Sequence, residues 1–155
     1  MAGARRDKAI IIDLDGTLSD SAHRQHFMEK TPKDWKAFYA ALVDDPPNQW
    51  CRELLIRFRS DRFSHFYEII LVSGRSDDYR EVTEAWLDKH KLSYDRLLMR
   101  KFGDFRADYI VKEEIYKAEI EPHCDVLFAV DDRKQVVDMW RRNGIVCLQC
   151  AEGNF

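Results

Sequence analysis

The sequence predicts an α/β protein in which helices cover both faces of a parallel β-sheet. Two observations support this class. Three runs of Ile, Leu, Val, Phe and Ala continue without polar interruption, as strands do when both faces of their sheet are buried. Helical patterns separate these runs, and alternating strands and helices are typical of right-handed parallel sheets. The runs are Ala9–Ile12, Ile69–Val72 and Val126–Val130.

Shorter signals complete the expected elements. Leu97–Met99 and Ile145–Leu148 are candidates for two more strands. We expect helices at residues 77–90, 108–119 and 135–142, with Asp108 as an N-cap and Asn143-Gly144 as a C-terminal stop. The residues expected to face inward on these helices are Tyr79, Val82, Trp86, Val111, Ile115, Ala118, Val136, Met139 and Trp140.

Residues 19–65 interrupt the alternation. About forty-five residues separate the first strand from the second, which is longer than a simple crossover needs. Within this stretch we expect a short helix around Trp35–Val43 and a second one at about residues 50–63. We interpret residues 19–47 as a small helical cap inserted after the first strand, within a single domain spanning residues 1–155.

Composition restricts the class of protein. The chain has 155 residues, of which 45% are hydrophobic and 34% charged, and its net charge is −3, so a globular domain is expected and global charge does not indicate a nucleic-acid binder. No apolar run reaches membrane-spanning length, and the first residues lack a secretory signal. We therefore expect a cytoplasmic (intracellular) protein with no membrane contact.

The four cysteines are expected to be reduced and mostly buried. They are Cys51, Cys124, Cys147 and Cys150. The pair Cys147-x-x-Cys150 has the spacing of a metal or redox site, but no second pair of ligands lies near it in the sequence. A zinc or redox role is therefore the minority interpretation.

Polar side chains follow each of the three main runs. Asp13 and Asp15 follow the first run, Ser73-Gly74-Arg75 the second, and Asp131-Asp132 the third. Ligands of open parallel sheets bind at the carboxyl ends of the strands, so these groups should meet at one edge. Four carboxylates within a few ångströms need a cation, and oxygen ligands favour Mg²⁺.

The same groups match what phosphoryl transfer needs. Ser73 and the backbone N–H groups after it can donate to phosphoryl oxygens, with Gly74 allowing close approach, and Lys112 can reach a transferring phosphoryl group. One carboxylate can be the nucleophile, and a second carboxylic acid two residues later can serve as acid and base. Each piece alone is common without function, since Ser-Gly is usually a turn and Asp-Asp is usually solvated. Their joint occurrence in this order predicts a phosphoryl-transfer site.

These elements resemble the motifs of the haloacid dehalogenase (HAD) superfamily of phosphotransferases. The motifs are Asp13-Leu-Asp15-Gly-Thr17, Ser73-Gly-Arg75, Lys112 and Asp131-Asp132. The resemblance implies a three-layer Rossmann-like fold with strand order 3-2-1-4-5. It implies Asp13 as nucleophile, Asp15 as acid/base, and Mg²⁺ held by Asp13, the Asp15 carbonyl and Asp131. Asp132 and Lys112 would complete the catalytic set, and Thr17 the substrate-binding set.

The C-terminal half is similar to the 3′-phosphatase domain of bacteriophage polynucleotide kinase/phosphatase. The similar segments are Val111–Ile115, Pro122-His123, Asp125-Val126, Ala129–Arg133, Gln135–Val137, Met139–Arg142 and Gly153-Asn154-Phe155. This resemblance implies that Arg24, Arg75 and Asp108 bind the substrate, because they match functional positions of that family in motif or spacing. No G-x-x-x-x-G-K-[ST] motif is present, so we expect no ATP-binding kinase module in this chain.

The leading hypothesis is therefore a polynucleotide 3′-phosphatase that acts on phosphate-ended DNA or RNA during end repair. The alternatives are a phosphatase of nucleotides or other small molecules, and a catalytically inactive binding module. Cap residues Trp35, Phe38 and Tyr39 could stack on a base or pack the cap, and His23 and His26 are expected on the cap surface. Three basic residues near the third strand could steer a polynucleotide backbone or lie in a solvated loop: Arg100, Lys101 and Arg106.

Overall fold

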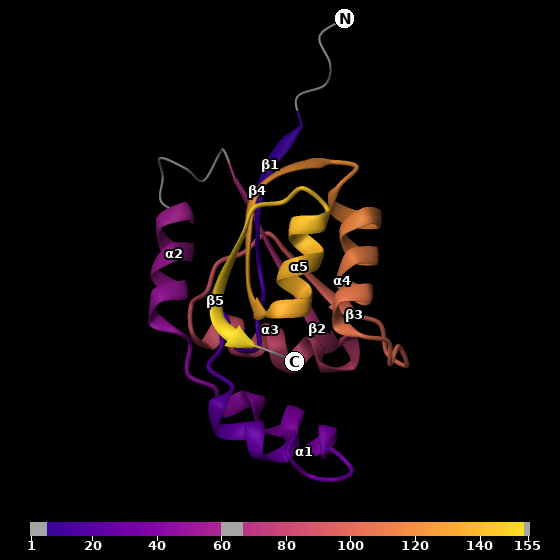
Figure 1. Cartoon of the computed structure of the whole chain (residues 1–155). Coiled ribbons are helices and arrows are strands. Elements are labelled where there is room, and N and C mark those ends of the chain that lie inside the picture. The colour runs from indigo at the N-terminus through magenta and orange to yellow at the C-terminus, as the bar shows by residue number, and fades with distance from the viewer. Residues whose placement is uncertain (1–5, 60–66, 154–155) are drawn as a thin grey trace, which may run out of the picture.

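A central parallel sheet organises the molecule. The computed structural model describes residues 6–59 and 67–153. Its five strands lie in the order β3-β2-β1-β4-β5, so the first strand of the chain occupies the middle of the sheet (Figure 1). This order confirms the predicted Rossmann-like topology. The strands are β1 Asp7–Ile12, β2 Glu68–Ser76, β3 Arg96–Arg100, β4 Cys124–Arg133 and β5 Cys147–Gly153.

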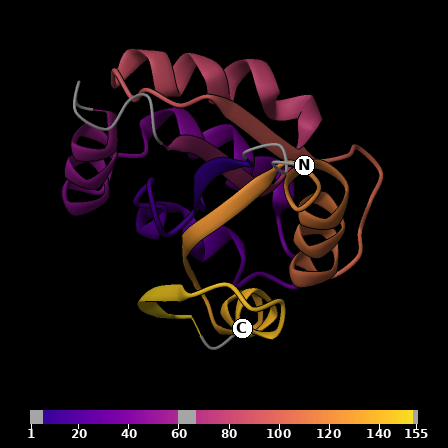
Figure 2. The same ribbon diagram turned by 90° about the horizontal axis from the view of Figure 1, so that it is seen from above.

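Helices cover both faces of this sheet. Figure 2 shows α2 and α3 on one side and α4 and α5 on the other, which gives the predicted three layers. None of the helices in the described part of the chain is long and apolar enough to cross a membrane. The helical elements are η1 Ala22–Phe27, α1 Trp35–Ala40, η2 Ala41–Asp44, α2 Gln49–Arg59, η3 Asp77–Tyr79, α3 Arg80–Lys89, α4 Asp108–Ile115, η4 Tyr116–Ile120 and α5 Lys134–Arg142.

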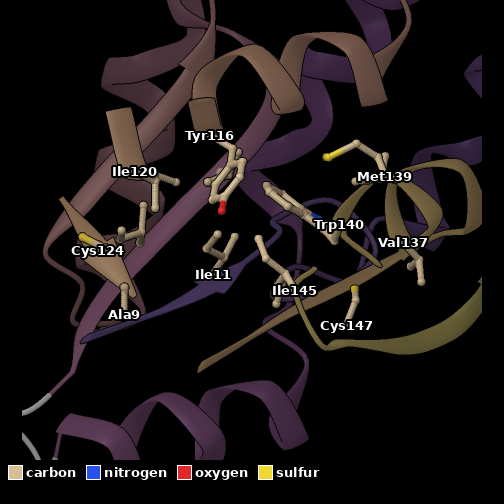
Figure 3. Close-up of a cluster of buried hydrophobic side chains, with 14 residues drawn as sticks. Ala9, Ile11, Tyr116, Ile120, Cys124, Val137, Met139, Trp140, Ile145 and Cys147 are labelled. Carbon is tan, nitrogen blue, oxygen red and sulfur yellow. The ribbon is translucent and has the colours of Figure 1, made fainter. Parts of the chain in front are cut away.

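The last four residues of β1, Ala9–Ile12, are apolar and buried because they contribute to two cores. Successive side chains of a strand point to opposite faces, so Ile10 packs on the α2/α3 side and Ile11 on the α4/α5 side. Figure 3 shows Ile11 next to Tyr116 and Trp140, whose rings meet edge to face with 5.8 Å between centroids. Burial on both faces fixes β1, and therefore fixes the position of the residues that follow it.

The start of α4 differs from the prediction. The residue before the helix is Ala107, and no side chain caps the helix there, so the prediction of Asp108 as N-cap is wrong. The Asp108 carboxylate lies instead 3.4 Å from Arg100 and 3.7 Å from the ammonium of Lys112. Arg133 lies 3.8 Å from the same carboxylate, so three cationic partners hold this side chain in the site.

Two buried helix faces are also shifted from their predicted positions. After α4 the chain widens into the π-helical turn η4, which buries Tyr116 and Ile120 and leaves the predicted inward residue Ala118 exposed. On α3 the buried residues are Thr83, Trp86 and Leu87, one position beyond the predicted Val82. On α5 the predicted inward residues are all buried.

Residues 19–47 lie beyond the carboxyl ends of the strands (Figure 1). Ser19 bridges both Asp15 and Pro47, so the two ends of this segment meet directly after β1. The helical elements α1 and η2 confirm the predicted short helix in this segment. Helix α2 begins close to its predicted start, and residues 60–63 of the predicted helix lie outside the described residues, as do Asn154 and Phe155.

Candidate active site

The predicted motifs meet at the carboxyl edge of the sheet. Asp13 and Asp15 follow β1, Ser73-Gly74-Arg75 closes β2, and Asp131-Asp132 closes β4. These strands are neighbours and parallel, so their ends face the same region. Lys112 reaches this edge from the second turn of α4, beside the sheet.

Asp13 is almost fully buried, and each of its carboxylate oxygens has a fixed partner. Lys112 Nζ donates to Asp13 Oδ1 at 2.7 Å, and Thr17 Oγ1 donates to Oδ2 at 3.0 Å. The backbone N–H of Thr17 donates to the carbonyl of Leu14 at 3.0 Å and so closes the turn that carries this side chain. The orientation of the Asp13 carboxylate is therefore set before any substrate arrives.

Lys112 is a buried cation that joins two carboxylates. Its ammonium also donates to Asp131 Oδ2 at 2.9 Å, and its side chain is 1% exposed. Burial lowers the pKa of Lys112, but Asp108, Asp13 and Asp131 outweigh this effect and raise that pKa well above its usual value. Lys112 therefore stays charged throughout the physiological pH range.

Asp13, Asp131 and Asp132 form a cluster that fits a hard divalent cation. Each offers one carboxylate oxygen, and these atoms all lie within 4.8 Å of one another. Burial and the neighbouring Asp131 raise the pKa of Asp13 well above its usual range, and they raise the pKa of Asp132 to about 6. The cluster thus has more negative charge than Lys112 alone offsets, and its ligands are all oxygens, as Mg²⁺ prefers.

The carboxylate of Asp15 is not part of this acidic cluster. We expected four clustered carboxylates, but Asp15 is turned away because two arginines bind it. Arg75 donates to its two oxygens at 2.9 and 2.7 Å, and Arg24 Nη2 donates to Oδ1. Burial favours the neutral form, yet Arg75 and Arg24 hold the pKa of Asp15 well below its usual range.

Arg75 and Arg24 are both buried, so neither is a solvated surface residue. The guanidinium of Arg75 also donates to Thr83 Oγ1 at 3.2 Å, and its backbone N–H donates to Ser73 Oγ at 3.1 Å. The predicted Ser-Gly-Arg turn is therefore locked to α3 and to Asp15.

Asp45 is a site residue that sequence reasoning missed. It is 1% exposed, and Arg24 donates to its two oxygens at 2.8 and 2.6 Å, while the ring of His23 lies 2.7 Å away. Its carbonyl accepts a hydrogen bond of 2.8 Å from the indole of Trp86 on α3. In the sequence, Asp44-Asp45-Pro46-Pro47 looks like a break between two helices. Only the approach of Arg24 in the structure reveals the ion pair with Asp45.

Two glycines of the motifs leave room for carboxylates. Gly16 has a φ of +84°, and a Cβ there would overlap the carboxylate of Asp132. A Cβ at Gly74 would overlap the carboxylate of Asp108. We expected Gly74 to admit a phosphoryl group, and the structure shows that it admits the Asp108 side chain.

A pocket of about 320 Å³ opens above these groups, between the sheet edge and residues 19–47. Its lining combines carboxylates, cations and aromatic rings. Trp35 is half exposed and stacks on Tyr39 with 5.9 Å between ring centroids, whereas Phe38 is buried, its ring 4.2 Å from the Arg24 guanidinium. The lining residues include Asp13, Asp15, Gln25, Lys33, Trp35, Tyr39, Gly74, Arg100, Asp108, Asp132 and Arg133.

The predicted peripheral groups divide into anchored and exposed residues. Arg100 donates to the carbonyls of Gly74 and Arg106, both at 2.7 Å, so it braces the structure as well as lining the pocket. Arg106 pairs with Asp104 at 2.7 Å and Glu114 at 2.6 Å. Lys101 and His26 are exposed.

All four cysteines lie within the described residues and none forms a disulfide. Within residues 6–59 and 67–153, the acidic cluster contains no cysteine or histidine, and Cys147 and Cys150 belong to no candidate metal group. Burial raises the pKa of Cys147 to about 12 and that of Cys150 to about 11.

Comparisons with known proteins agree with this geometry. A family profile described as the phosphatase domain of polynucleotide kinase PNKP, of the HAD class, matches residues 7–155. The chain superposes on a component of the Pnkp1/Rnl/Hen1 RNA repair complex with a TM-score of 0.81 and 38% identity, covering 97% of this chain and 44% of that one. A HAD-like hydrolase of Streptococcus pneumoniae shares the fold alone, with a TM-score of 0.60, 16% identity, and coverage of 92% and 84%.

A viral relative extends the similarity in sequence. A protein of Autographa californica nuclear polyhedrosis virus, assigned as a bifunctional polynucleotide kinase/RNA ligase, is 25% identical over 140 residues, which are 90% of this chain and 18% of that protein. This chain therefore spans less than half the length of the viral protein and of the repair-complex component. Because the family profile matches residues 7–155, which is nearly the whole chain, the protein belongs to the polynucleotide kinase-type phosphatase family of the HAD superfamily.

Proposed function

We propose that this chain is a Mg²⁺-dependent phosphomonoesterase that removes 3′-phosphate groups from polynucleotide ends. The observation that carries this proposal is the Asp13 carboxylate, held at the base of the pocket by Lys112 and Thr17. A carboxylate fixed in this way is ready for attack on a phosphorus atom. Bound Mg²⁺, held by Asp13, the Asp15 carbonyl and Asp131 beside Asp132, would neutralise charge on the transferring phosphoryl group.

In the first step, an oxygen of Asp13 attacks phosphorus and the bond from phosphorus to the 3′-oxygen breaks, which gives an aspartyl-phosphate. The leaving oxygen takes a proton from Asp15. In the second step, Asp15 takes a proton from water, the water oxygen attacks the same phosphorus, and the Asp13 carboxylate is released with phosphate. Lys112 stabilises the negative charge that develops on the phosphoryl oxygens.

The two arginines have to change partners for this cycle to run. While Arg24 and Arg75 bind Asp15, the low pKa of that carboxyl keeps it ionised and unable to give a proton. A substrate phosphate is a competing anion that matches the fork of a guanidinium. We propose that the phosphate draws both arginines from Asp15, whose pKa then rises, so that it takes up a proton from water and can donate it to the leaving oxygen. Ser73, Gly74 and Asp108 would shape the rest of the phosphate cradle.

The polynucleotide substrate is supported by the relatives and by the pocket. The solved relative is part of an RNA repair complex and is 38% identical. Lys33, Arg100 and Arg133 line the pocket beside the half-exposed Trp35, so the pocket wall combines positive charge with an aromatic ring, as a nucleotide requires. We further propose that residues 19–47 act as a substrate-selecting cap within one domain spanning residues 1–155. Four free thiols support an intracellular location.

A nucleotidase is the second candidate, and the volume of the pocket, as distinct from its lining, favours it. A volume of about 320 Å³ lies at the lower end of the range for small-molecule sites, so one nucleotide would fill it. The chemistry at Asp13 would be the same. Only the part of the substrate beyond the terminal nucleotide separates the two functions.

A substrate panel tests the choice. With Mg²⁺ present, phosphate release is measured from a 3′-phosphate oligonucleotide, its 5′-phosphate counterpart, and the 3′- and 5′-mononucleotides. We expect the largest kcat/KM for the 3′-phosphate oligonucleotide. Equal or larger values for the mononucleotides would replace the polynucleotide function with the nucleotidase. Absence of Mg²⁺-dependent release from all four would reject the phosphatase itself.

A further inference from the structure

The loop between β3 and α4 carries the two most exposed phenylalanines in the described part of the chain. Phe102 is 76% exposed and Phe105 is 95% exposed. A phenylalanine ring is usually buried, because removal of its apolar surface from water lowers the free energy of the folded protein. Two such rings, three residues apart, need a reason that the fold itself does not provide.

This loop is held in one conformation by hydrogen bonds. Arg100 Nη1 donates to the carbonyls of Asp104 at 3.0 Å and Arg106 at 2.7 Å, so the side chain of Arg100 fastens the loop from inside. The N–H of Phe102 donates to the carboxylate of Asp77 at 2.9 Å. The two rings therefore stand on a braced backbone.

The same bonds place the loop beside the proposed phosphate site. Arg100 Nε donates to the carbonyl of Gly74 in the Ser-Gly-Arg turn at 2.7 Å. Asp77, which accepts from Phe102, is the first residue after β2. The residues that flank the loop, Arg100 and Asp108, both line the pocket. Figure 1 shows the loop leaving β3 at the end of the sheet where α1 lies.

Charge does not account for this surface. Arg106 is engaged by Asp104 and Glu114, and Arg100 is directed into the loop, so two of its three basic residues are paired with protein groups. The groups that remain outward and without these ion pairs are Lys101 and the two phenylalanine rings. Two exposed aromatic rings beside a proposed phosphate-binding pocket suit nucleobases, which stack on phenylalanine without regard to sequence.

We propose that Phe102 and Phe105 form a stacking platform for the bases of a single-stranded 3′ end, for the nucleotides that precede the phosphorylated one. This inference rests on the proposed function and names the form of its substrate. Bases in a duplex are already stacked and cannot reach the platform without unpairing. The terminal phosphate enters the pocket, and the preceding bases lie across the loop.

The test uses the double variant F102A/F105A and a 3′-phosphate hexanucleotide, with the 3′-mononucleotide as reference. We expect the ratio of the two kcat/KM values to fall about 5- to 100-fold, the loss that removal of one stacked base corresponds to. The control V146A/L148A alters two apolar side chains that are 63% and 51% exposed, and it should leave the ratio unchanged.

A hexanucleotide with abasic sugars before its terminal nucleotide completes the design. On this substrate the wild type should show the same low ratio as F102A/F105A, and the double variant should lose nothing more. If the wild type prefers the hexanucleotide and F102A/F105A keeps that preference, the stacking proposal is rejected and the polynucleotide function is retained. The exposed rings would then be assigned to contact with a protein partner. If the wild type prefers the mononucleotide, the polynucleotide function fails and the platform with it.

Discussion

The carboxyl edge of the sheet and residues 19–47 are held in place by different interactions. Asp13 and Asp131 sit at the ends of strands whose side chains are buried in two apolar cores, so packing fixes them. Residues 19–47 contribute few buried apolar side chains, and their central contact is the ion pair of Arg24 with Asp45, both almost fully buried. Trp86 and Asp15 connect this pair to the rest of the molecule.

The difference separates two tasks. A nucleophile has to be held within a fraction of an ångström of its position, and strand ends packed from both sides can provide this. A segment held by charges can exchange partners when an anionic substrate arrives, because a phosphate competes for the same guanidinium groups. Substitutions in the two regions should therefore have different consequences.

The largest effect is expected at the packed edge. Asp13→Asn keeps the shape of the side chain but removes the nucleophilic oxygen, so phosphate release should fall by at least about 10,000-fold with no loss of folding. Kinetics with the 3′-phosphate oligonucleotide and a thermal melt would measure this. Asp138→Asn, on an exposed Asp of α5, is the matched control. Activity near wild type in D13N would mean that another group is the nucleophile.

The next effect is expected at the charged contact. Asp45→Asn removes one of the two carboxylates that the buried Arg24 binds and leaves only Asp15, so we expect a loss of up to about 3 kcal/mol in the free energy of unfolding and a lower kcat/KM. Denaturant unfolding and steady-state kinetics check both, with the exposed neighbour Asp44→Asn as control. The pair R24M/D45L should recover stability but not activity. Recovery of both would show that the ion pair has no part in substrate use.

Two glycines with similar backbones sharpen the comparison. Gly16 and Gly144 have φ values of +84° and +78°, so alanine at either should cost about 1 kcal/mol of stability. A Cβ at Gly144 meets nothing within 4 Å, whereas a Cβ at Gly16 overlaps Asp132. G144A should therefore retain full activity and G16A should lose most of it, as melts and kinetics would reveal. Equal activities would show that the Asp132 carboxylate can move freely.

The smallest effect concerns the thiols. Burial raises the pKa of Cys150 to about 11, so at pH 8 this thiol is mostly protonated and should react about 100-fold more slowly than a free cysteine. Because the pKa is raised, the rate should increase about tenfold per pH unit until pH approaches that value. Disulfide-reagent kinetics on native and unfolded protein measure this. Rapid reaction at neutral pH would restore the redox interpretation of Cys147 and Cys150.

The sheet and the catalytic edge could be predicted from the sequence because their signals are local. A continuous apolar run buried on both faces has few alternatives, and polar residues directly after it lie at the strand end. The contacts of Asp15 could not be predicted in this way, since Arg24 and Arg75 approach it from distant parts of the chain. The buried role of Asp45 depends on the same long-range approach. The shifted face at Ala118 arises from one widened helical turn, which periodicity does not reveal.

During translation, β1 is synthesised long before β2 and β4, the strands that flank it in the sheet. Both edges of this Ile-rich strand stay unpaired until β2 and β4 have been synthesised, which takes roughly 6–24 s at ordinary elongation rates. Charged residues stand directly at its two ends, Asp7 and Lys8 on one side and Asp13 and Asp15 on the other. Such residues oppose the association of exposed apolar strands. The carboxylates of the site are thus also charges that flank an apolar strand before its neighbours in the sheet have been made.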